Sequence, residues 1–136
     1  MFAGTHFNGD VSRWNVSNVD DMSSMFSFSQ FNGDVSQWNV SNVKNMSKMF
    51  CHCMAKSINL SSFNTPRLQE VNYMFAGCSA TNLDVSTLNT HLVNNMSGMF
   101  ESCLAEKIIF GNFDTSNVQT MTRMFKDNHA RTLDYL

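Results

Sequence analysis

The chain has 136 residues, a formal net charge of −2, 15% charged residues and 43% hydrophobic residues. The hydrophobic share is sufficient for a folded core, and the lack of a Lys/Arg-rich stripe argues against a nucleic-acid partner. No run of about 18 apolar residues occurs, so we expect no membrane insertion within this chain. Its first residues also lack the basic and apolar segments of a signal peptide.

The dipeptide Met-Phe recurs six times, and consecutive copies are 24 or 25 residues apart. A fixed period of this length is typical of solenoids, in which each coil contacts only its neighbours. We therefore expect residues 1–136 to form a single repeat solenoid of about five coils. Because the first copy already stands in phase, we expect the chain to be a piece of a longer protein. The coils are expected to end near Phe2, Phe26, Phe50, Phe75, Phe100 and Phe125.

The first half of each coil predicts a short β-strand. In the fourth coil, Leu83 and Val85 alternate with polar residues, which is the pattern of a half-buried strand. The equivalent positions of the other coils are apolar, and a wide apolar residue follows each strand. The strand positions are Val11, Val35, Leu60, Val85, Phe110 and Tyr135, and the wide positions are Trp14, Trp38, Phe63, Leu88 and Phe113.

The second half of each coil predicts a short helix. In the fourth coil, Val93, Met96, Met99 and Phe100 fall at i, i+3, i+6 and i+7, which places them on one helical face. A Ser before the apolar run is a typical N-cap, as at Ser17. Two apolar columns on this side should face the core. They are Val19, Val43, Leu68, Val93 and Val118, and Met22, Met46, Val71, Met96 and Met121.

Residues 55–64 resemble the leucine-rich-repeat pattern L-x-x-L-x-L-x-x-N/C. Residues 7–26 and 31–50 resemble the more specific repeat of BspA-like leucine-rich-repeat surface proteins, F-N-x-D-V-S-x-W-N-V-S-N-V-x-x-M-x-x-M-F. The resemblance implies a leucine-rich-repeat-like solenoid with short parallel strands on one side and short helices or turns on the other. It also implies a non-catalytic module, without cofactors, at the cell surface or secreted. Its partners would be host matrix proteins or other surface proteins.

The outward strand positions form the candidate binding face, because partners usually lie on the continuous strand face of such repeats. This face is small, polar and mildly acidic and has no aromatic anchor, so we expect weak binding per coil and avidity from many copies. The predicted binding face consists of Asp10, Ser12, Arg13, Asp34, Ser36, Gln37, Asn59, Ser61, Ser62, Asp84, Ser86, Thr87, Ile109 and Asn112.

The acidic column of this face allows two interpretations. Asp10 and Asp34 are in phase, so a calcium ion could bridge them. Two carboxylates fall far short of the six to eight oxygens that calcium takes. The favoured interpretation is that these acids are solvated and keep the strand face soluble. A second polar column, which includes Asn15 and Asn39, is expected to bond to turn backbone.

Neither the cysteines nor the histidines predict an enzyme. Buried thiols and at least one disulfide both remain open for Cys51, Cys53, Cys78 and Cys103. The Cys-His-Cys spacing around His52 is unusual for zinc, so we expect no metal site. The four His residues share no column and no nucleophile motif is present. Besides a surface binding module, an intracellular protein scaffold and a passive spacer in a surface stalk remain as alternatives.

Overall fold

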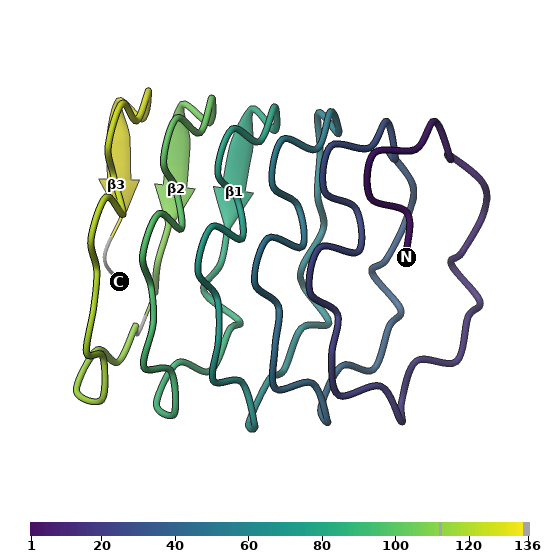
Figure 1. The fold of residues 1–136 in the computed structure, drawn as a ribbon, viewed down its shortest axis with the longest axis horizontal. Coiled ribbons are helices and arrows are strands. Elements are labelled where there is room, and N and C mark those ends of the chain that lie inside the picture. The colour runs from purple at the N-terminus through teal and green to yellow at the C-terminus, as the bar shows by residue number, and fades with distance from the viewer. Residues whose placement is uncertain (112, 135–136) are drawn as a thin grey trace.

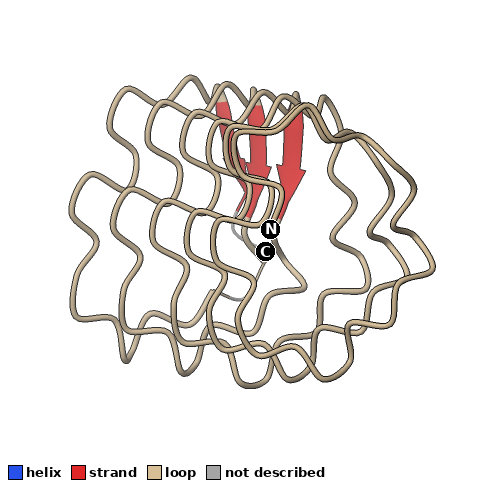
Figure 2. Cartoon of the chain, turned by 45° about the vertical axis from the view of Figure 1, so that its right-hand side comes forward, coloured by secondary structure: helices blue, strands red, loops and turns tan. Residues whose placement is uncertain are grey.

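The computed structural model describes residues 1–111 and 113–134. Three short strands, β1 (Asn82–Asp84), β2 (Lys107–Ile109) and β3 (Thr132–Asp134), form one parallel sheet in the order β1-β2-β3. Leu83 of β1 is in register with Ile108 of β2. Figure 2 shows these strands at one side of a chain that otherwise consists of turns and irregular segments.

The fold class predicted from the sequence, a leucine-rich-repeat-like solenoid with short parallel strands on one side and short helices or turns on the other, is wrong. The described residues contain no helix, and their only strands are the three three-residue segments of the later repeats. In the segment expected to be helical in the fourth coil, Asn95 forms isolated parallel bridges to Glu70 and Thr120, and residues 97–102 are turns. Tyr135, which was expected to extend the apolar strand column, lies outside the described residues.

Successive repeats lie side by side and are joined by backbone hydrogen bonds (Figure 1). In the third repeat, the N–H of Phe75 donates to the carbonyl of Met99 at 2.9 Å, whereas the N–H of Met74 folds back to the carbonyl of Val71 at 3.1 Å. Alternate N–H groups therefore bond between repeats and within a turn. The equivalent bonds between the other repeats join Phe2 to Met25, Phe26 to Met49, Phe50 to Met74 and Phe100 to Met124.

Positive φ angles explain why these segments are turns. Five of these segments contain two residues with φ between 53° and 67°, and the N-terminal segment contains one, Gly4. A type II turn requires a positive φ at its third position. A left-handed residue every four positions cannot belong to a right-handed helix. The first column contains Ser24, Lys48, Tyr73, Gly98 and Arg123, and the second contains Gly4, Phe28, His52, Gly77, Ser102 and Asp127.

Consecutive four-residue turns also reproduce the apolar spacing of a helix. Met96, Met99 and Phe100 all point into the core and are fully buried, although they belong to two adjoining turns and not to one helical face. The spacing of three and four residues therefore predicted correctly that these side chains are buried, but it predicted the wrong backbone conformation.

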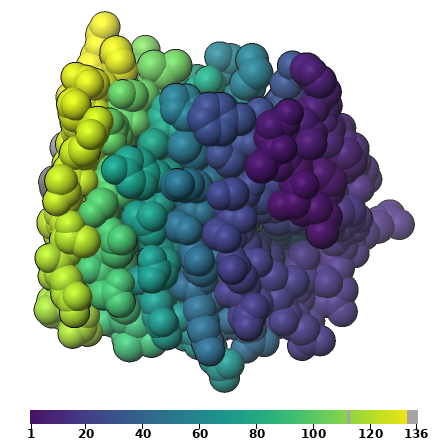
Figure 3. Space-filling model, in the orientation of Figure 1, coloured from purple at the N-terminus to yellow at the C-terminus, as the bar shows by residue number. Residues whose placement is uncertain are grey.

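A stack of phenylalanine rings runs through the core. Its rings are contributed by Phe2, Phe26, Phe50, Phe75, Phe100 and Phe125, and we call this set the phenylalanine ladder. Neighbouring centroids are 5.7–5.9 Å apart and the ring planes are within 20° of parallel. Figure 3 shows the repeats from outside, as adjacent bands of chain colour across the molecule. Each repeat thus packs mainly on the repeats that flank it.

The predicted core columns are buried in the middle repeats, and some of their members in the outer repeats are exposed. Met46 and Met96 are 0% exposed, whereas Met121 of the same column is 42% exposed. The wide column behaves in the same way, with Trp38 at 1% and Trp14 at 41%. The indole N–H of Trp38 donates to the carbonyl of Val11 at 3.0 Å, which ties the buried ring to the preceding repeat.

Candidate functional site

The predicted binding face is open to solvent throughout the described part of the chain. None of its described residues is buried; Asp34, Asn59 and Asp84 are exposed, and Ile109 is half-buried. Asn112 lies outside the described residues. Asp84 is the last residue of β1, Ile109 is the last residue of β2, and the two are paired in the parallel register. The earlier members stand in phase on segments that are not strands.

Turn geometry fixes the acids and amides of this face. The side-chain Oδ1 of Asp34 accepts the backbone N–H of Ser36 at 2.8 Å, which closes an Asx turn, and Asn59 does the same for Ser61 at 2.9 Å. The repeated motif is Asp or Asn, any residue, then Ser. Ten such turns occur among the described residues, at Asp10, Asn15, Asp21, Asp34, Asn39, Asn45, Asn59, Asp84, Asn95 and Asp114.

The Asx turns also correct the predicted helix start at Ser17. That residue does not cap a helix. Its N–H and its hydroxyl both donate to Oδ1 of Asn15, at 3.1 and 2.6 Å. The second polar column therefore bonds to turn backbone, as expected for Asn15 and Asn39. The motif that sequence reasoning missed is the Ser two residues after each Asp or Asn, and it was visible in the sequence.

The electrostatics of the face follow from these turns. The hydroxyl and backbone N–H of Ser12 lower the pKa of Asp10, and Ser36 lowers the pKa of Asp34 in the same way. The negative charge of Asp10 acts in the opposite direction and slightly raises the pKa of Asp34. No group of three or more His, Cys, Asp or Glu side chains is placed to hold a metal ion among the residues described. Asp10 and Asp34 both act as the first residue of an Asx turn.

Hydroxyl groups connect the face to the neighbouring repeats. Ser62 donates to the carbonyl of Trp38 at 3.1 Å, and Thr87 donates to the carbonyl of Leu60 at 2.8 Å. The face is hollowed between the second and third repeats, where Asn32, Gly33, Asp34, Ser57 and Asn59 surround a polar depression. The face therefore presents fixed polar groups around a shallow hollow.

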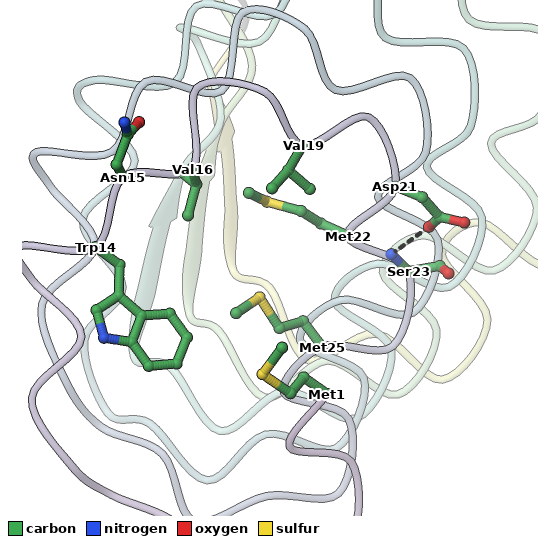
Figure 4. Close-up of a pocket in the computed structure, with 9 residues that line it drawn as sticks. All are labelled: Met1, Trp14, Asn15, Val16, Val19, Asp21, Met22, Ser23 and Met25. Atoms are coloured by element: carbon green, nitrogen blue, oxygen red, sulfur yellow. Dashed lines mark hydrogen bonds between the residues drawn. The ribbon is translucent and has the colours of Figure 1, made fainter.

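A more apolar cavity lies in the first repeats (Figure 4). Trp14, Val16, Val19 and Met22 point into its space, and Oδ1 of Asp21 is held at the rim by a neighbouring N–H. No sequence pattern predicts this cavity, because lining residues such as Trp14 and Val19 belong to columns that are buried in the middle repeats. A third hollow, lined by Cys51, His52, Tyr73, Ala76, Glu101 and Ser102, lies on the turn side.

All four cysteines are buried and free. Burial raises the pKa of the Cys78 thiol to about 12 and also raises the pKa of Cys53 and Cys103. These thiols are protonated and shielded at neutral pH, so they pack as small apolar groups. In the described part of the chain, no helix is long and apolar enough to cross a membrane.

The in-phase turns and ring contacts are those of a repeat protein. A family model described as "Mycoplasma protein of unknown function, DUF285" matches residues 1–85 and 72–134. The chain belongs to this family. No curated protein matches the chain, and no solved structure matches it either.

Proposed function

We propose that this chain is a non-catalytic protein-binding module displayed at the cell surface, where it contributes to adhesion through the predicted binding face. The observation that carries the proposal is the face itself: its polar side chains are in phase from repeat to repeat, at least partly exposed, and held by local turns. Pre-organised side chains lose little conformational entropy when a partner binds.

The resemblance to BspA-like surface proteins supports the location and the class of partner, which is a host matrix protein or another surface protein. The chemistry of the face supports weak contacts per repeat. Aromatic and Arg side chains dominate strong interfaces, and among the described residues of this face only Arg13 is of that kind. Display in many copies would then supply the avidity.

The test is adhesion of beads carrying many copies of the chain to immobilised matrix protein. A variant with Asp34→Lys, Asn59→Lys and Asp84→Lys is expected to lose adhesion. Because those changes also remove three Asx turns, a second variant with Asp34→Asn and Asp84→Asn keeps the turns and removes only charge. It is expected to lose adhesion partially.

The matched control introduces the same number of lysines outside the predicted binding face. Asp20, Gln69 and Gln119 are in phase and exposed, so the variant Asp20→Lys, Gln69→Lys and Gln119→Lys should leave adhesion unchanged. Loss in this control alone means that the partner lies on the turn side. No loss in any variant favours a passive spacer.

A further inference from the structure

Two Asn-Gly pairs occur at equivalent positions of the first two repeats, Asn8-Gly9 and Asn32-Gly33. The fold requires glycine there because an aromatic ring lies against it. A Cβ on Gly33 would be 2.7 Å from Cε2 of Phe31, and Gly9 has the same relation to its own Phe at 2.8 Å. Because the ring leaves no room for a Cβ, each of these asparagines is followed by a residue without a side chain.

The surroundings of Asn32 leave its side-chain amide reactive. Asn32 and Gly33 are both exposed. Oδ1 of Asn32 accepts the backbone N–H of Lys56 at 3.2 Å, and Oδ1 of Asn8 accepts the N–H of Asn32 at 2.9 Å. A donor on Oδ1 polarises the amide carbon and stabilises negative charge that develops on that oxygen. Within the described residues, the N–H of Gly33 has no hydrogen-bond acceptor.

The same position in the fourth repeat provides an internal contrast. Asn82 is exposed, but it is followed by Leu83, whose side chain is 1% exposed and packed in the core. Asn82 also begins strand β1 and is paired in register with Lys107. Because Leu83 is buried and lies in a paired strand, its backbone nitrogen is less free to approach the side chain of Asn82.

We propose that Asn32, and with it Asn8, is a site of spontaneous deamidation. The backbone nitrogen of Gly33 attacks Cγ of Asn32, forming a C–N bond and a five-membered succinimide ring. The bond from Cγ to Nδ2 breaks, and Nδ2 leaves as ammonia with the proton that the Gly33 nitrogen gives up. Water then opens the ring at either carbonyl and yields aspartate or isoaspartate.

The modification changes the hollow on the predicted binding face, so it goes beyond the proposed function. Aspartate at position 32 can still accept the N–H of Lys56, and it adds a second carboxylate beside Asp34. Isoaspartate instead lengthens the main chain by one methylene group, which separates the ring of Phe31 from Gly33. The first product recharges the hollow, and the second disturbs the repeat.

The test is peptide mapping of the folded chain during incubation in mildly alkaline buffer. Trypsin separates Asn8, Asn32 and Asn82 into three peptides, because Arg13, Lys44 and Arg67 lie between them. Fragment spectra then locate each conversion from amide to acid, and an isoaspartate methyltransferase counts the rearranged product. We expect Asn32 to convert about tenfold faster than Asn82, a difference of about 1.4 kcal/mol in activation free energy.

Conversion of Asn32 no faster than that of Asn82 in the folded chain overturns the proposal. Gly33→Ala provides a second readout, since it should slow conversion at Asn32 while Asn8 in the same molecule continues at its original rate. Equal conversion at Asn32 with and without this change would also overturn the proposed attack by the Gly33 nitrogen. The wild-type comparison decides the question even if the Gly33→Ala chain does not fold.

Discussion

Removal of one ring from the middle of the phenylalanine ladder should destabilise the protein severely. Phe75 is 0% exposed, and its ring centroid lies 5.8 Å from that of Phe50 and 5.8 Å from that of Phe100. Truncation of a buried Phe to Ala costs about 3–5 kcal/mol. Because Phe75→Ala also ends two stacked ring contacts, we expect a value at the upper end of this range. That loss is comparable with the whole free energy of unfolding of a marginal domain, about 5–15 kcal/mol.

Phe125→Ala is the matched comparison, since the ring of Phe125 is 37% exposed and stacks on one ladder neighbour, Phe100. We expect a loss of about 2–3 kcal/mol, below the usual range for a buried Phe. Phe75→Leu keeps most of the volume and should cost about 1–2 kcal/mol. Urea unfolding monitored by circular dichroism gives all three values. A loss for Phe75→Ala no larger than that for Phe125→Ala would refute the claim that the ladder stabilises the middle repeats.

Three further outcomes follow from the turns and the core. Gly98→Ala should destabilise the fold by about 1–2 kcal/mol through its left-handed φ of 62°. A steric cost adds to this loss, because the new Cβ would meet the ring of Tyr73. Urea unfolding should show that only this added cost disappears in the Tyr73→Ala background. The pKa of Asp10 is lowered in the folded state, so its contribution to stability is present above pH 3.8 and is lost as the pH falls through the folded pKa. Asp10→Asn keeps the turn, and this contribution should be absent when the free energy of unfolding of that variant is measured against pH. Cys78, with a pKa near 12, should resist alkylation at neutral pH until urea unfolds the chain, and rapid labelling of the native protein would contradict its burial.

The sequence predicted the repeat and its buried columns well, because burial depends mainly on the spacing of apolar side chains. Met46, Met96 and Val85 were all assigned to the core and all have 0% exposure. The prediction was wrong for the backbone between them. A helix and a series of turns place apolar residues at the same intervals. The left-handed φ angles that distinguish the turns from a helix occur mostly at residues other than glycine, such as Lys48 and Tyr73, so the sequence does not mark them.

The strands were predicted in every repeat but are limited to the last three. In the first two repeats, the amide oxygen of Asn8 accepts the N–H of Asn32, and that of Asn32 accepts the N–H of Lys56. A side chain thus replaces the backbone carbonyl of a parallel ladder. The polar positions of the predicted binding face are exposed or half-buried in the described residues, which their alternation with apolar positions indicates. Their local role required recognition of the Asx turn, a short-range motif that column-by-column comparison does not emphasise.

Hydrogen-bond scalar couplings measured by NMR test most directly whether the repeats are joined through alternating backbone bonds. The structure predicts couplings from the amide nitrogen of Phe50 to the carbonyl carbon of Met74, and from Phe75 to Met99, across N···O distances of 2.9 Å in both cases. Couplings from these amides to carbonyls four residues earlier would instead indicate helices and would contradict the turn-based arrangement of the repeats.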